Sequence, residues 1–151
     1  MKSTLRMGLP LLAAALVFGL LSSLPAADAK PDFSGQWKMN AEKSDFGPLP
    51  APTSRNDKIE HKEPNLKITR TQSSQQGENT SEWDCTTDGK ECKVEMRGSP
   101  LKLKTTVQWD GDALAFDHKG TFNDLDIRIK EKWTLSEDGK VITIKRHVSS
   151  P

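Results

Sequence analysis

Short runs of alternating apolar and polar residues recur along the chain from about residue 35 to residue 148. No long segment places apolar residues at the i, i+3, i+4 and i+7 positions that mark an amphipathic helix. The alternation therefore predicts an all-β domain whose strands have one buried and one solvated face. We expect strands at residues 35–40, 55–62, 65–72, 79–87, 90–97, 101–109, 113–119, 125–135 and 140–148.

Turn dipeptides separate these runs and indicate how the strands connect. Asp-Gly, the strongest short-range hairpin signal, lies between alternating runs at Asp88-Gly89, Asp110-Gly111 and Asp138-Gly139. Short turns between consecutive strands predict an antiparallel up-and-down meander of about eight to ten strands. No helix is available to cover the apolar face, so the sheet must cover itself. Closure into a barrel would also remove both open edges.

The chain has two cysteines, Cys85 and Cys92, which lie symmetrically about Asp88-Gly89. A redox pair would more often have Cys-x-x-Cys spacing, and a zinc site would need further ligands. A two-residue hairpin places the cysteines opposite each other at a hydrogen-bonded pair, where Cα atoms are about 5.5 Å apart. We therefore expect a disulfide, which persists in an oxidising compartment. The same register places Trp83 opposite Val94.

Residues that lie symmetrically about other turns are also expected to be cross-strand pairs. About the last Asp-Gly turn this symmetry places Glu131 opposite Arg146. About Gly98-Ser99 it places Val94 opposite Leu103.

Four polar residues interrupt the apolar face: Arg70, His118, Glu131 and Arg146. One interpretation is an internal Glu131–Arg146 ion pair, because a lone buried charge is unfavourable, with Arg70 and His118 at a wet barrel mouth. The other is a cavity whose polar end has one net positive charge and holds an anionic head group, with Arg70 as the free anchor. The four tryptophans on this face either line such a pocket or form plain core; they are Trp37, Trp83, Trp109 and Trp133.

Residues 1–29 are typical of a signal peptide. Lys2 and Arg6 precede a short apolar run, and Ala27-Asp28-Ala29 is a small-x-small cleavage pattern. We expect an exported protein, periplasmic or extracellular, with no stable membrane span after cleavage. Residues 30–151 would form a single domain that contains a proline-rich loop at 41–54. Without the leader the chain has 22 − 2 = 20 basic and 21 − 1 = 20 acidic residues, so nucleic-acid binding is not expected.

The stretch "FSGQWKMN" at residues 33–40 resembles the Gly-x-Trp start of lipocalins and the Phe-x-Gly-x-Trp-Lys start of fatty-acid-binding proteins. Both are calycin β-barrels that carry small hydrophobic molecules, so the resemblance implies a lipocalin-like barrel. It also implies that Arg146, late in the chain, packs near Trp37. The longer run "WKMNAEKSDFGPLPAP" is similar to the opening of small exported bacterial proteins of an uncharacterised family.

The motifs favour binding over catalysis. The chain has no Gly-x-Ser-x-Gly and no His-Glu-x-x-His, and its three histidines share no metal-ligand spacing. We therefore predict no enzyme activity, catalytic residue, metal or cofactor. The expected function is exported, non-enzymatic binding of a hydrophobic or amphipathic small molecule with an anionic head group. The alternative is a structural or protein-interaction module of the cell envelope; a cavity of a few hundred Å³ favours the former and a packed barrel core the latter. The sequence predicts no oligomeric state.

The outward face carries a basic group on neighbouring strands. It is either a contact surface for anionic lipid or polysaccharide or a solvated face with edge-blunting lysines. Its members are Lys93, Arg97, Lys102, Lys104, Arg128, Lys130 and Lys132.

Overall fold

The computed structural model describes residues 29–150, so the predicted signal peptide lies almost wholly outside the described residues. These residues form ten strands and one short 3-10 helix, η1 (Ala41–Lys43), at the start of the proline-rich loop. The prediction of an all-β fold is therefore confirmed. The strands are β1 (Gly35–Lys38), β2 (Ser54–Lys62), β3 (Asn65–Ser74), β4 (Gly77–Thr86), β5 (Asp88–Glu91), β6 (Lys93–Arg97), β7 (Lys102–Asp110), β8 (Ala113–Phe122), β9 (Leu125–Leu135) and β10 (Ile142–Ser149).

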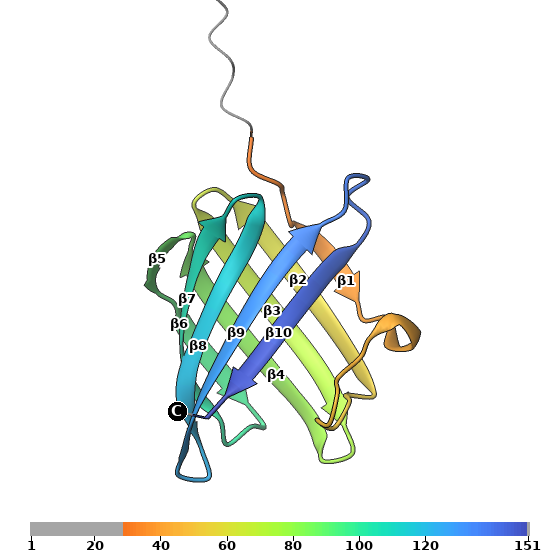
Figure 1. Cartoon of the computed structure of the whole chain (residues 1–151), viewed down its shortest axis with the longest axis vertical. Helices are drawn as coiled ribbons and strands as arrows, with labels where there is room; N and C mark the ends of the chain where they lie inside the picture. The colour runs from red at the N-terminus through yellow and green to blue at the C-terminus, as the bar shows by residue number, and fades with distance from the viewer. Residues whose placement is uncertain (1–28, 151) are drawn as a thin grey trace, which may run out of the picture.

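The strands form two five-stranded antiparallel sheets that face each other with crossed strand directions (Figure 1). Sheet 1 has the order β1-β2-β3-β4-β6, and sheet 2 has the order β10-β9-β8-β7-β5. Most strands pair with their neighbours in sequence, as a meander requires. The exception is the exchange of β5 and β6, which takes the chain from sheet 1 to sheet 2 and back.

The expected closed barrel is not present, because hydrogen-bonded pairing in the described chain does not join the two sheets. β1 has only four residues and pairs with residues 56–59 of β2 before the chain turns away into the loop. β6 and β7 do not pair either, so the expected Val94–Leu103 register is wrong. The connection between them contains Gly98 in a left-handed conformation and Pro100, which has no backbone N–H.

The Cys85–Cys92 disulfide is confirmed, but its setting differs from the expected hairpin tip. Its Cα atoms lie 4.4 Å apart, close to the spacing of a non-hydrogen-bonded pair. Asp88-Gly89 belongs to β5, which pairs with β7 of sheet 2. The Cys92 backbone N–H donates to the Thr105 carbonyl of β7 at 2.8 Å, and the next residue begins β6 of sheet 1. The disulfide thus lies where the chain crosses between the sheets.

Other predicted registers are confirmed. Trp83 lies opposite Val94 in sheet 1, and Glu131 lies opposite Arg146 in sheet 2. In β8, Gly120 allows β7 to approach closely, since a Cβ there would lie 1.9 Å from the Lys102 carbonyl oxygen.

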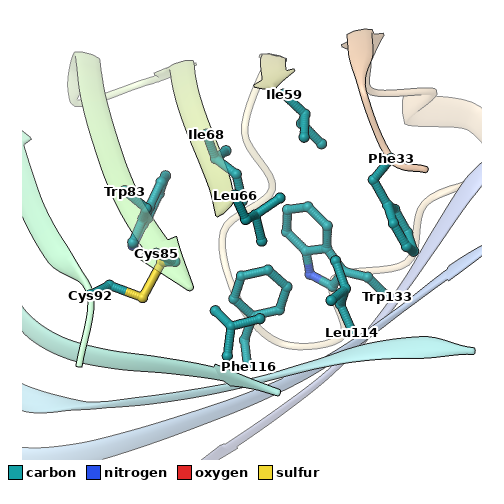
Figure 2. Packing of buried hydrophobic residues seen from close by; sticks show 11 residues of the cluster. Phe33, Ile59, Leu66, Ile68, Trp83, Cys85, Cys92, Leu114, Phe116 and Trp133 are labelled. Atoms are coloured by element: carbon teal, nitrogen blue, oxygen red, sulfur yellow. A yellow bond between two sulfur atoms is a disulfide. The ribbon is translucent and has the colours of Figure 1, made fainter. Parts of the chain in front are cut away.

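Large apolar side chains from both sheets fill the space between them (Figure 2). Trp133 and Phe116 of sheet 2 have ring centroids 4.5 Å apart and face Leu66 and Ile68 of sheet 1. Phe33 is fully buried although it precedes the first strand, where alternation gives no signal. Trp37 and Trp109 are only partly buried and pack at the margin of this core.

The segment before β1 covers one end of the core. The Phe33 backbone N–H donates to His61 Nδ1 at 3.2 Å, and the Ser34 hydroxyl bonds both backbone groups of His61. Ser34 therefore occupies the place of a strand partner where β1 has not yet begun. This end is closed by side-chain and backbone contacts rather than by a strand.

Replacing both cysteines by serine is expected to lower the free energy of unfolding by about 2–3 kcal/mol, the loop-entropy value for so short a loop. Urea unfolding followed by tryptophan fluorescence measures the loss. Wild-type protein in dithiothreitol should match the double variant, and the variant should not respond to reductant. Equal stability of oxidised and reduced wild-type protein would contradict the expectation.

Candidate functional site

A group of six polar side chains lies between the sheets, and we call it the interior charge cluster. Sheet 1 contributes three members from β2 and β3, and sheet 2 contributes three from β8, β9 and β10. All lie on strand faces directed toward the core, and all except Arg146 are largely shielded from solvent. The members are Arg55, Asp57, Arg70, His118, Glu131 and Arg146.

Asp57 is the centre of the sheet 1 half. Arg70 Nε and Nη2 donate to its two carboxylate oxygens at 2.9 and 3.0 Å. Arg55 donates to the same carboxylate through Nε at 3.1 Å and Nη2 at 2.6 Å. Both guanidiniums therefore bind in the bidentate geometry that gives the strongest Arg–carboxylate contacts. The Arg70 guanidinium also lies 4.9 Å from the ring centre of Trp83 and 5.7 Å from that of Trp133, which belongs to the other sheet.

Glu131 is the centre of the sheet 2 half. Arg146 Nη2 lies 2.6 Å from its Oε1, and the Trp133 indole N–H donates to its Oε2 at 2.8 Å. The Arg146 side chain retains 34% of its exposure, so this half of the cluster reaches the surface. His118 Nδ1 forms a 2.8 Å hydrogen bond with the fully buried Thr105 hydroxyl. Every charged member thus has a partner of opposite charge, and the imidazole has a hydrogen-bond partner.

The environment of the cluster keeps both acids ionised. Burial would raise the pKa of Asp57, but Arg70 and Arg55 hold it below its usual value. Burial also opposes ionisation of Glu131, yet Arg146, Arg70 and His118, with the Trp133 hydrogen bond, lower its pKa to about 2. Burial lowers the pKa of His118, which is therefore neutral at pH 7. Three arginines and two carboxylates leave one net positive charge.

Little space remains inside the cluster. The cavity bordered by Arg70, Trp83, His118, Glu131 and neighbouring aromatic rings measures about 10 Å³, room for about one water molecule. The Trp83 indole N–H has no hydrogen-bond partner, and one water here could satisfy it. A fatty acid or similar ligand does not fit at this position without movement of the surrounding side chains.

The structure brings together six of the residues predicted to bind a ligand: Arg70, Trp83, His118, Glu131, Trp133 and Arg146. Two others are elsewhere. The Trp37 indole donates to the Phe33 carbonyl, and Trp109 lies at the end covered by the N-terminal segment. The proposed role of Arg70 as a free anchor is wrong, because Asp57 already binds its guanidinium.

Sequence reasoning missed Arg55 and Asp57, the partners of Arg70. They lie two and four residues before the buried Ile59 in β2. Because alternate residues of a strand share a face, the inward direction of Ile59 predicts that both point inward.

A second polar group, which we call the end cluster, lies at the end of the core that the N-terminal segment covers. Glu63 is its centre, since His61, Thr87 and Trp109 all hydrogen-bond to its carboxylate at 2.8–3.1 Å. Burial opposes ionisation of this carboxylate, but these three hydrogen bonds hold the pKa of Glu63 below its usual value. Lys30 lies 5.3 Å from the Trp109 ring and donates to the Gly111 carbonyl at 2.7 Å. The end cluster therefore fixes the N-terminal segment in place.

Beside the end cluster, an open surface groove of about 410 Å³ runs along β2 and β3. Ile59 and His61 line it together with the charged residues Glu60, Lys62 and Lys67. Within residues 29–150, no group of three or more metal-ligating side chains is close enough to hold a metal ion. Nor does this part of the chain contain a helix long and apolar enough to cross a membrane.

Comparison with known proteins finds no matching family model, no similar curated protein and no similar solved structure. The lipocalin resemblance therefore rests on residues 33–40 of the sequence.

Replacing Asp57 by Asn should lower the free energy of unfolding by about 3–5 kcal/mol, because two buried guanidiniums lose their counter-charge. Urea unfolding at pH 7 measures the effect. The matched control is Asp117→Asn, which removes an Arg-paired carboxylate on the outer face of sheet 2 and should change stability much less. Equal losses of unfolding free energy in the two variants would show that Asp57 contributes no more to stability than the outer-face Asp117.

Stability should fall as pH decreases. The folded-state pKa values of Glu131, Asp57 and His118 all lie below their ordinary values, so the unfolded chain takes up protons first. The loss should begin near pH 6.5 through His118. The contribution of Glu131 to the free energy of unfolding, on the order of 3 kcal/mol, should be lost between pH 4.5 and about 2. Urea midpoints from pH 7 to 2.5 test this, and Glu131→Gln should flatten the acidic part of the curve; an unchanged slope would refute the assignment.

Proposed function

We propose that this protein is an exported, non-catalytic structural or interaction module of the cell envelope that acts through its surface. The observation that carries the proposal is the state of the interior charge cluster. Its charged side chains bind one another, and the cavity among them holds about one water molecule. Binding sites for drug-sized ligands are commonly 300–1,000 Å³ in volume, far larger than this space.

Two further observations support an extracytoplasmic location. The Cys85–Cys92 disulfide fits a non-reducing compartment, and the first 29 residues have the pattern of a cleavable leader. The Gly-x-Trp opening and a strand order that is sequential apart from β5 and β6 also support a relation to lipocalin-like barrels. In this proposal the chain is a relative of such barrels whose two sheets stay separate, with four edge strands and a filled interior.

The second candidate function is the binding of a hydrophobic or amphipathic small molecule with an anionic head group. The observation that favours it is the groove of about 410 Å³ on β2 and β3, which is lined by Ile59 and by two lysines, Lys62 and Lys67, against one acid, Glu60. A ligand there would lie outside the interior charge cluster. Its head group would meet the lysines and not Arg70.

Native mass spectrometry of protein purified from its host compartment tests the main proposal. We expect the mass of the processed chain with no co-purifying small molecule. Titration with palmitate to high micromolar concentration should also leave tryptophan emission unchanged, because Trp83 and Trp133 line a space that the ligand cannot enter. A bound molecule at one-to-one stoichiometry would overturn the proposal.

Should a ligand bind, two lysine variants locate it. Lys67→Ala removes a residue of the groove, and Lys58→Ala removes an equally exposed lysine of the neighbouring strand that does not line it. Weaker binding by the first variant alone places the ligand in the groove. Unchanged binding by both places it elsewhere and removes the support for the groove as its site.

A further inference from the structure

The β8–β9 hairpin ends in two exposed apolar side chains. Phe122 retains 43% of its exposure and Leu125 retains 63%, although both are large and hydrophobic. The two residues between them, Asn123 and Asp124, have φ values of 49° and 63°. Left-handed conformation at both positions is the geometry of the tightest hairpin turn, which Asn and Asp tolerate better than most residues.

The tip has a defined shape and direction. Phe122 and Leu125 are directly opposite in the β8–β9 register, so their side chains lie on the same side of the hairpin. The hairpin projects at the end of the molecule remote from the N-terminal segment (Figure 1). Both side chains belong to the face that is buried further along the strands, at Phe116 for example, but at the tip this face extends past the core.

Basic side chains lie behind this tip on the outer face of sheet 2. Lys104, Lys119 and Arg128 are register partners across β7, β8 and β9, three residues along the strands from the Phe122–Leu125 pair. At about 3.3 Å per residue, this basic row lies about 10 Å behind the tip. Lys102 lies between the row and the tip, opposite Thr121.

Three acidic residues partly offset these charges. Asp117 pairs with Arg128 at 2.6 Å and lies 4.0 Å from Lys119, Asp126 lies opposite Thr121, and Asp124 lies in the turn itself. The four basic and three acidic residues sum to a net charge of +1. Lys102 and Lys104 are exposed, and Lys119 retains most of its exposure. Basic groups therefore remain available to an anionic partner.

We propose that the β8–β9 tip docks on the surface of an anionic phospholipid bilayer. Apolar groups of interfacial proteins enter the boundary between head groups and acyl chains by about 5–10 Å. Insertion of Phe122 and Leu125 to that depth places the basic row at the level of the lipid phosphates, where lysine and arginine are attracted to anionic lipids. A basic face that is merely solvated does not account for two apolar side chains at its projecting end. The inference rests on the proposed function, because a module with a filled interior acts through its surface.

Co-sedimentation with vesicles of equal parts phosphatidylglycerol and phosphatidylcholine tests the proposal, with processed protein purified from its host compartment. The variant Phe122→Ser/Leu125→Ser should bind at least tenfold more weakly than wild-type protein. The matched control, Leu49→Ser/Val141→Ser, removes two apolar side chains of similar exposure, 47% and 55%, from other loops. It should bind within twofold of wild-type protein.

Two further measurements examine the geometry. Phe122→Trp keeps the tip apolar, so it should retain binding, and emission from the new indole should be quenched by lipids brominated on their acyl chains. Wild-type binding should weaken by tenfold or more when salt rises from 50 to 500 mM or when phosphatidylglycerol is omitted, because the basic row contributes through charge.

Several results would overturn the proposal. They are an absence of wild-type binding, equal binding by wild-type protein and the tip variant, or an unquenched new indole in the bound Phe122→Trp variant. If the tip substitutions abolish self-association in sedimentation velocity experiments and leave vesicle binding unchanged, the tip is a contact between copies of this chain. None of these outcomes bears on the filled interior, which native mass spectrometry tests separately.

Discussion

The Asp57 carboxylate holds together a structure that would otherwise bury two positive charges without compensation. Arg55 and Arg70 both depend on it, and Arg70 in turn stacks on one tryptophan from each sheet. Transfer of these charges from water is expensive, and it is offset only when their hydrogen bonds and ion pairs are made together. A one-residue slip of β3 against β2 would direct Arg70 to the solvent face and remove it from Asp57. The ion pairs therefore fix the strand register within each sheet, and the contacts of Arg55 and Arg70 with the Trp133 ring link the two sheets.

The same interactions limit what the interior can do. An arginine that faces a barrel interior can bind a carboxylate ligand, but here Asp57 and Glu131 supply the carboxylates from the chain itself. The one net positive charge lies in the sheet 1 half, where Arg55 and Arg70 share the Asp57 carboxylate. The aromatic rings around the cluster complete the filling of the centre. The interior is thus filled by the chain's own side chains, and the exposed parts of the molecule are the groove, the outer faces and the projecting turns.

Strand parity predicted much of this arrangement and failed where its signal was weak. It placed Glu131 opposite Arg146 and Trp83 opposite Val94, because those strands carry several apolar residues that define their inward side. It missed Asp57 because the first part of β2 has no apolar residue before Ile59 to mark that side. Barrel closure could not be inferred, since local turns do not determine whether the first and last strands meet. Asp88-Gly89 resembled a hairpin turn, yet the four residues of β5, none of them apolar and bulky, form an edge strand of the opposite sheet.

The exchange of β5 and β6 makes the two sheets depend on each other for their assembly. Each sheet obtains its last strand from a segment that also supplies a strand to the opposite sheet, within the 15 residues from Asp88 to Lys102. Neither sheet can complete its edge while the other is unfolded, because the chain must pass through both in succession. The molecule therefore has no smaller unit that could fold alone, and its unfolding should be cooperative, as a single transition. Cutting the chain between the sheets would not yield two stable halves, since no cut separates them.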